Sequence, residues 1–180
     1  ADDYGQGIAM PHLGIIRPQS HYFTSNPMIH LYMQADISRG ENVVTMYDER
    51  TMGNDNDKLC SLRLKYHVEK RERCSKENIN PPSIYISIRD NCVGQNKSNV
   101  TLMFDCFMAM LFYDRVMIIY LIPSYSYMLP NQVVSWVKRC LNKKNIYVPK
   151  DILKEMNGVC SVKANFIRHN KGRHPCFAGW

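Results

Sequence analysis

The 24-residue segment from Val100 to Pro123 is the most hydrophobic stretch of the chain. Charged residues interrupt it at Asp105, Asp114 and Arg115, so its longest unbroken apolar runs are only seven residues each. A membrane-spanning helix needs about 20 nearly uncharged residues, and an Asp–Arg pair inside lipid is costly. We therefore expect this segment to form the centre of a folded core and not to span a membrane.

The two halves of this segment have different composition. Val116–Ile122 is rich in β-branched residues, shows no polar alternation and is closed by a proline, which predicts a strand buried on both faces. Phe104–Tyr113 fits either a second buried strand, joined to the first by a hairpin, or a short buried helix. Its Met, Ala and Leu residues favour the helix and its Phe and Tyr residues favour the strand; we prefer the strand.

Apolar and polar residues alternate in several other segments, which is typical of half-buried strands. The segments are Ile29–Ile37, Cys60–Val68 and Ile84–Ile88. In the second of these, the alternation predicts that Leu62, Leu64 and Tyr66 point inward. Asn42–Tyr47 is expected to be a further strand, because it follows the turn-forming residues Arg39-Gly40-Glu41.

Helical patterns follow Pro123. Pro130–Lys144 places Val133, Val134, Val137 and Leu141 on one helical face. Pro149–Gly158 starts with proline and ends with glycine, as short helices do. Short strands are expected at Asn145–Val148 and near Val162–Phe166. We predict an α+β fold in a single domain, residues 1–180, with a mostly antiparallel sheet in residues 20–122 and short helices after residue 130. The alternative is an all-β sandwich with decorating helices.

Positive charge is concentrated at the C-terminal end of the chain. The formal net charge is +7, and Lys138–Arg173 holds ten basic and two acidic residues. Such asymmetry indicates contact with a polyanion, namely nucleic acid or an acidic glycan, or with an acidic protein surface. A solvated basic face without a partner is the alternative. The candidate binding residues are Lys138, Arg139, Lys143, Lys144, Lys163, Arg168, Lys171 and Arg173.

Seven cysteines are widely spaced, and none forms a CxxC pair. The chain therefore carries neither a thioredoxin-type redox motif nor a zinc ribbon. Reduced buried thiols are the expectation, and an extracellular disulfide framework is the alternative, although the odd number would leave one thiol over. The chain begins with Ala1 and not with Met, which fits a processed, extracellular chain or a trimmed one.

Three weaker constellations involve metal ligands or a nucleophile. Cys160, His169, His174 and Cys176 are ligand types that zinc accepts, but their spacing matches no common zinc finger. His12, His21 and His30 recur every nine residues, which chance also produces. Cys106 beside Asp105 is a nucleophile candidate that we expect to be buried and therefore inert.

These observations favour a binding or assembly protein over an enzyme. The basic C-terminal segment, residues 138–173, would contact the anionic partner, and no cofactor is expected. One alternative is a small hydrolase or thiol enzyme built on the Cys and His residues. The other is an extracellular, disulfide-bonded ligand or inhibitor.

Overall fold

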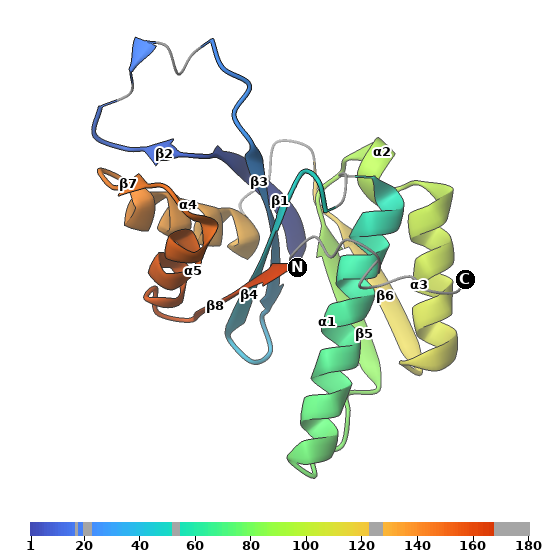
Figure 1. The fold of residues 1–180 in the computed structure, drawn as a ribbon. Helices are drawn as coiled ribbons and strands as arrows, with labels where there is room; N and C mark the ends of the chain where they lie inside the picture. Colours follow the sequence, from blue (N-terminus) through green and yellow to red (C-terminus); the bar gives the residue numbers. More distant parts are fainter. Residues whose placement is uncertain (17, 20–22, 52–54, 123–127, 168–180) are drawn as a thin grey trace. The chain divides into compact units, whose positions relative to one another are not determined.

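The computed structural model describes residues 1–16, 18–19, 23–51, 55–122 and 128–167. The chain divides into two compact units (Figure 1). Unit 1 comprises Ala1–Met52 and Ser126–His169, and unit 2 comprises Gly53–Tyr125 and Asn170–Trp180. That the whole chain is one domain stays a prediction.

Unit 1 is built on a four-stranded sheet in the order β1-β3-β4-β8. The strands are β1 (Asp2–Ala9), β3 (Met28–Asp36), β4 (Glu41–Asp48) and β8 (Val162–Ile167). The first three pair antiparallel, whereas β8 lies parallel to β4. The expected strands over Ile29–Ile37, Asn42–Tyr47 and Val162–Phe166 are confirmed, apart from Ile37, which lies just beyond β3.

Two helices pack against the apolar face of this sheet. They are α4 (Leu129–Leu141) and α5 (Pro149–Asn157), and both follow the predicted segments closely. The core joins Leu31 and Met46, which are partners in the sheet, to Val133 and Val137 of α4 and Ile152 of α5. Side chains alternate along a strand, so a shift of one residue would turn the apolar side chains away from α4 and α5. Packing against these helices therefore fixes the register of the strands.

A short ladder connects the N-terminal segment to the end of α4. β2 (His12–Leu13) pairs antiparallel with β7 (Asn145–Ile146). The backbone N–H of Gly14 also donates to the carbonyl of Lys144 at 2.9 Å. The turn that follows α4 is therefore held in place by main-chain hydrogen bonds from a segment about 130 residues away in the sequence.

Unit 2 contains a two-stranded parallel sheet and its helices. The strands are β5 (Ile84–Arg89) and β6 (Arg115–Tyr120), and the helices are α1 (Asn56–Lys76), α2 (Val93–Asn96) and α3 (Asn99–Leu111). Tyr85 contacts His67 of α1, and Arg89 contacts Asp105 of α3. Since Tyr85 and Arg89 lie four residues apart on one strand, they share a face, so both helices cover the same face of β5.

The prediction of a strand at Cys60–Val68 is wrong, because this span lies inside α1. The apolar residues of this span alternate as in a strand, but some of them are also spaced as on one face of a helix. Leu59, Leu62 and Tyr66, at intervals of three and four residues, are the ones that are buried. Asp55 caps the helix by accepting a hydrogen bond from the N–H of Lys58 at 2.9 Å. Val68, at the far end of the expected strand, is exposed.

The preferred strand over Phe104–Tyr113 is also wrong, because the first nine residues of this stretch complete helix α3 and its cap. Ser98 caps the helix by accepting from the N–H of Thr101 at 3.2 Å. The alternative, a short helix, is correct, although most of it is not buried: Met103 and Met110 are 73% and 81% exposed.

A strand was expected at Val116–Ile122, and β6 confirms it in part. Its predicted burial on both faces is wrong, because Met117 and Ile119 are 52% and 42% exposed. Their partners in register include Ile86, which is 50% exposed as well. The reason is that α1 and α3 cover one face of this sheet only.

The α+β prediction is confirmed by helices and mixed sheets that together dominate both units. Residues 20–122 contribute the antiparallel pair β3–β4 and the parallel pair β5–β6. In the part of the chain that the structure describes, no helix has the length and apolar character required to cross a membrane.

Candidate functional site: a pocket beside the basic end of helix α4

Four of the candidate cations lie close together at the C-terminal end of α4. Lys138 and Arg139 occupy its last turn, and Lys143 and Lys144 follow within five residues. All four side chains are exposed. Carbonyl groups at a helix C-terminus carry partial negative charge, which stabilises cations there. We call this group of four residues the basic end of α4.

The cations in this group differ in their ionic partners. Lys144 pairs with Glu155 of α5 at 2.5 Å. Within the described residues, no carboxylate lies at ion-pair distance from Lys138, Arg139 or Lys143. The ammonium of Lys138 instead donates to Oε1 of Gln6 on β1 at 2.7 Å. Three of the four cations are therefore not neutralised by acidic neighbours in this part of the molecule.

The remaining candidates do not extend this group in the described structure. Lys163 lies on β8 between Val162 and Ala164, which pack into the core. Its side chain therefore points to the opposite face of the sheet from α4, where it pairs with Glu41 at 3.1 Å. Arg168, Lys171 and Arg173 lie outside the described residues.

A pocket of about 390 Å³ lies next to the basic end of α4. It is formed by β1, β3 and α4 of unit 1 together with the β2 segment. Its apolar wall consists of Ile8, Met28, Leu31, Val134, Val137 and Leu141. Its volume falls at the lower end of the range of roughly 300–1,000 Å³ found for small-molecule sites.

Polar groups line one side of this pocket: Gln6, His12, Lys138 and Asn142. Nε2 of His12 lies 3.2 Å from the carbonyl oxygen of Leu141. Because a carbonyl only accepts, Nε2 must carry a proton and donate. The pocket thus combines an apolar wall with two side-chain amides, an imidazole and an ammonium group. The ammonium group is that of Lys138, which also belongs to the basic end of α4.

Close backbone contact fixes the turn that carries Lys143 and Lys144. A Cβ added to Gly14 would lie 2.7 Å from the oxygen and 2.8 Å from the nitrogen of Lys144. Only glycine therefore fits at this position without a shift of the turn. Sequence reasoning missed this glycine and the pocket, because both depend on contacts between segments that are distant in the chain.

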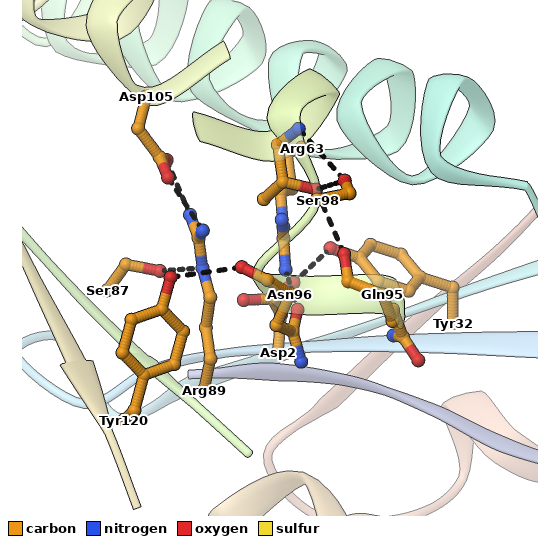
Figure 2. Close-up of polar contacts among 11 residues, drawn as sticks. Asp2, Tyr32, Arg63, Ser87, Arg89, Gln95, Asn96, Ser98, Asp105 and Tyr120 are labelled. Atoms are coloured by element: carbon orange, nitrogen blue, oxygen red, sulfur yellow. Dashed lines mark hydrogen bonds and ion pairs between the residues drawn. The ribbon is translucent and has the colours of Figure 1, made fainter. Parts of the chain in front are cut away.

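A second group of polar residues lies inside unit 2, where Arg89 and Arg63 are fully buried (Figure 2). The guanidinium of Arg89 donates to both oxygens of Asp105 at 2.7 and 2.6 Å, and its Nε donates to Ser87 at 2.8 Å. Arg63 donates to Oδ1 of Asn96 at 2.9 Å.

Burial by itself would lower the pKa of Arg89, but the hydrogen bonds and charge of Asp105 outweigh it and raise that pKa. The Arg89 guanidinium therefore stays charged. The hydroxyl of Tyr120 on β6 donates to the carbonyl of Asn96 at 3.0 Å, which adds the second strand to the same network. These bonds join β5, β6, α1 and the α2–α3 region, so we assign the group a structural role.

The cysteine and histidine candidates do not assemble into a reactive pair among the described residues. Cys106 is exposed and not buried as expected, and its neighbour Asp105 is bound to Arg89. His67 is buried and lies 2.7 Å from the hydroxyl of Tyr113. Burial raises the pKa of the Cys60 thiol to about 11 and also raises the pKa of Cys140. Both thiols are therefore protonated near neutral pH and are weak nucleophiles.

Most of the proposed metal ligands cannot be placed, so the suggested zinc site stays a prediction. His169, His174, Cys176 and His21 lie outside the described residues, and Cys160 is exposed. His12 belongs to β2, whereas His30 lies on β3 and stacks on Tyr47. Over the described ranges, no cluster of three or more His, Cys, Asp or Glu residues could hold a metal ion.

No protein-family model, curated protein or solved structure matches the chain.

Proposed function

We propose that this protein binds a polyanion through the basic end of α4. The observation that carries the proposal is the group of four exposed cations within seven residues, three of them without an acidic neighbour among the described residues. An array of this kind attracts regularly spaced phosphate or sulfate groups, because their binding releases condensed counterions.

The rigid position of these cations supports the same proposal. Lys138 and Arg139 are fixed by the helix, and Lys143 and Lys144 by the Gly14 contact and the β2–β7 ladder. Long flexible side chains lose conformational entropy on binding, and a fixed backbone limits the additional loss. Tyr147, which is 67% exposed and follows β7 directly, offers a flat aromatic face three residues beyond Lys144.

The test is a fluorescence titration of the full chain with heparin, single-stranded RNA and duplex DNA at two salt concentrations. Each cation–phosphate contact contributes roughly −0.7 to −0.9 to the slope of log K against log[salt]. We expect steeply salt-dependent binding to at least one of these polymers. The double variant Lys143→Glu/Lys144→Glu should bind more weakly and show a shallower slope.

A matched control changes the net charge by the same amount elsewhere. Lys76→Glu/Arg115→Glu reverses two exposed cations of unit 2. This control should retain most of the affinity if the basic end of α4 is the binding surface. Equal loss in both double variants would show that only net charge matters, and absence of binding to all three polymers at low salt would remove the proposal.

A further inference from the structure

We infer that the pocket beside the basic end of α4 receives a base of a single-stranded nucleic acid. This inference rests on the proposed function, because it names the polyanion that the basic end of α4 would bind. Lys138 belongs both to that group of cations and to the lining of the pocket, and Asn142 lines the pocket one residue before Lys143. A strand whose phosphates contact the cations therefore has its bases within reach of the pocket.

The apolar wall distinguishes between classes of polyanion. Val134 and Val137 of α4 and Ile8 of β1 line the pocket, and such side chains pack against the flat apolar face of a base. A sulfated glycan carries charged groups along its sugar rings, which are costly to bury, and it has no flat aromatic base to pack against this wall. In a duplex the bases are stacked and paired, so extracting one costs additional free energy. A single strand offers bases that are already accessible.

The polar side of the pocket complements a base edge. Gln6 and Asn142 each carry an amide with donor and acceptor groups. Hydrogen bonds from such groups to the edges of splayed-out bases are the usual means of single-strand recognition. The pocket volume of about 390 Å³ admits one base with its sugar but not a folded polymer segment.

The experiment compares oligonucleotides that differ only in their bases. Full-length protein is titrated at fixed low salt with a 12-residue oligothymidylate, with an abasic 12-residue strand of the same backbone, and with a heparin fragment of similar charge. Stacking of one base on an aromatic side chain typically strengthens binding by about 5- to 150-fold, and the apolar wall of this pocket is aliphatic, so an effect at the lower end of that range is expected. We expect oligothymidylate to bind at least about 10-fold more tightly than the abasic strand.

Two variants locate the effect. Val134→Phe places a larger side chain at the half-buried edge of the pocket and should bring the affinity for oligothymidylate down to that for the abasic strand, with the salt slope unchanged. Because this variant alters packing, Gln6→Ala/Asn142→Ala is tested in parallel. Both of its residues are exposed, so it should fold and lower the preference for bases several-fold.

Each outcome has a distinct meaning. A preference for oligothymidylate that both variants reduce supports the inference. Equal binding of oligothymidylate, the abasic strand and heparin overturns it, while the proposed polyanion binding stands. A preference for bases that neither variant changes also overturns it, because the bases then bind elsewhere. Absence of binding to all three probes removes the proposed function and the inference together.

Discussion

Arg89 on β5 and Asp105 on α3 form a bidentate ion pair, with N–O distances of 2.7 and 2.6 Å, and both side chains are almost completely buried. The pair lies between the strand and the helix that connects it to β6. Ser87 accepts a further hydrogen bond from the same guanidinium. Charged and polar side chains therefore occupy the helix-facing side of β5, whereas Ile84 and Ile86 on its other face are exposed.

Removing one partner of this pair should destabilise unit 2 strongly. Asp105→Asn leaves the Arg89 guanidinium buried without a countercharge, and breaking a buried pair in this way costs about 3–5 kcal/mol. Urea unfolding followed by circular dichroism measures the loss. As a control, Glu41→Gln breaks the more exposed pair with Lys163 and should cost less than about 1 kcal/mol. Similar effects of the two substitutions would show that the Arg89–Asp105 pair contributes no more than a surface ion pair.

The exposed face of β6 predicts that a charged residue is tolerated at Ile119, although the surrounding sequence is apolar. Ile119 is 42% exposed, so Ile119→Asp should cost no more than about 1 kcal/mol, since its charge stays hydrated. Met108 on α3 is fully buried. Met108→Asp should cost several kcal/mol, because it buries an unpaired charge. Thermal unfolding of the two variants checks the order, and a larger loss for Ile119→Asp would contradict the observed exposure.

The Cys60 thiol predicts a loss of stability at alkaline pH. Its pKa is raised by burial from about 9 to about 11. Because the pKa is raised in the folded state, the protonated thiol stabilises the folded protein fully below pH 9, and this stabilisation is lost as the pH rises through 11. Two pKa units correspond to about 3 kcal/mol. The wild type should therefore lose this amount relative to Cys60→Ala between pH 8.5 and pH 11.5, as measured by urea unfolding.

A non-titrating variant controls for the titration of other groups in this range. Ser61 is buried next to Cys60 on α1, and its hydroxyl donates to the carbonyl of Asp57. The stability difference between the wild type and Ser61→Ala should be the same at both pH values. A constant difference for Cys60→Ala as well would refute the assignment of the alkaline loss to this thiol.

The close contact of Gly14 with Lys144 predicts that adding a single methyl group at Gly14 lowers the stability of the protein. In Gly14→Ala, the new Cβ would collide with the backbone of Lys144, which is itself hydrogen-bonded in the turn. Overpacking of this kind costs about 1–3 kcal/mol. Gly94 has nothing within 4 Å of an added Cβ, so Gly94→Ala should be neutral or stabilise by up to about 1 kcal/mol. The unfolding midpoints of the two variants in urea give the comparison.

Local patterns in the sequence predicted the elements whose periodicity is unambiguous. β3, α4 and α5 were expected nearly at their observed bounds, because their apolar residues repeat with one clear period. β4 was expected because it follows the turn at Gly40. The position of positive charge could also be read directly, since Lys138, Arg139, Lys143 and Lys144 fall within seven consecutive residues. Within the candidate site, the sequence indicated the cations but not the pocket beside them.

Tertiary contacts decided the rest. Cys60–Val68 alternates like a strand but belongs to a capped 21-residue helix, because its buried side chains pack at helical intervals against α3 and β5. Val116–Ile119 reads as a buried strand, yet one of its faces is exposed because both helices lie on the other. The pocket, the Gly14 contact and the Arg89–Asp105 pair each join segments distant in the chain. A periodic pattern shows which residues share a face, and only the packed chain determines what lies against that face.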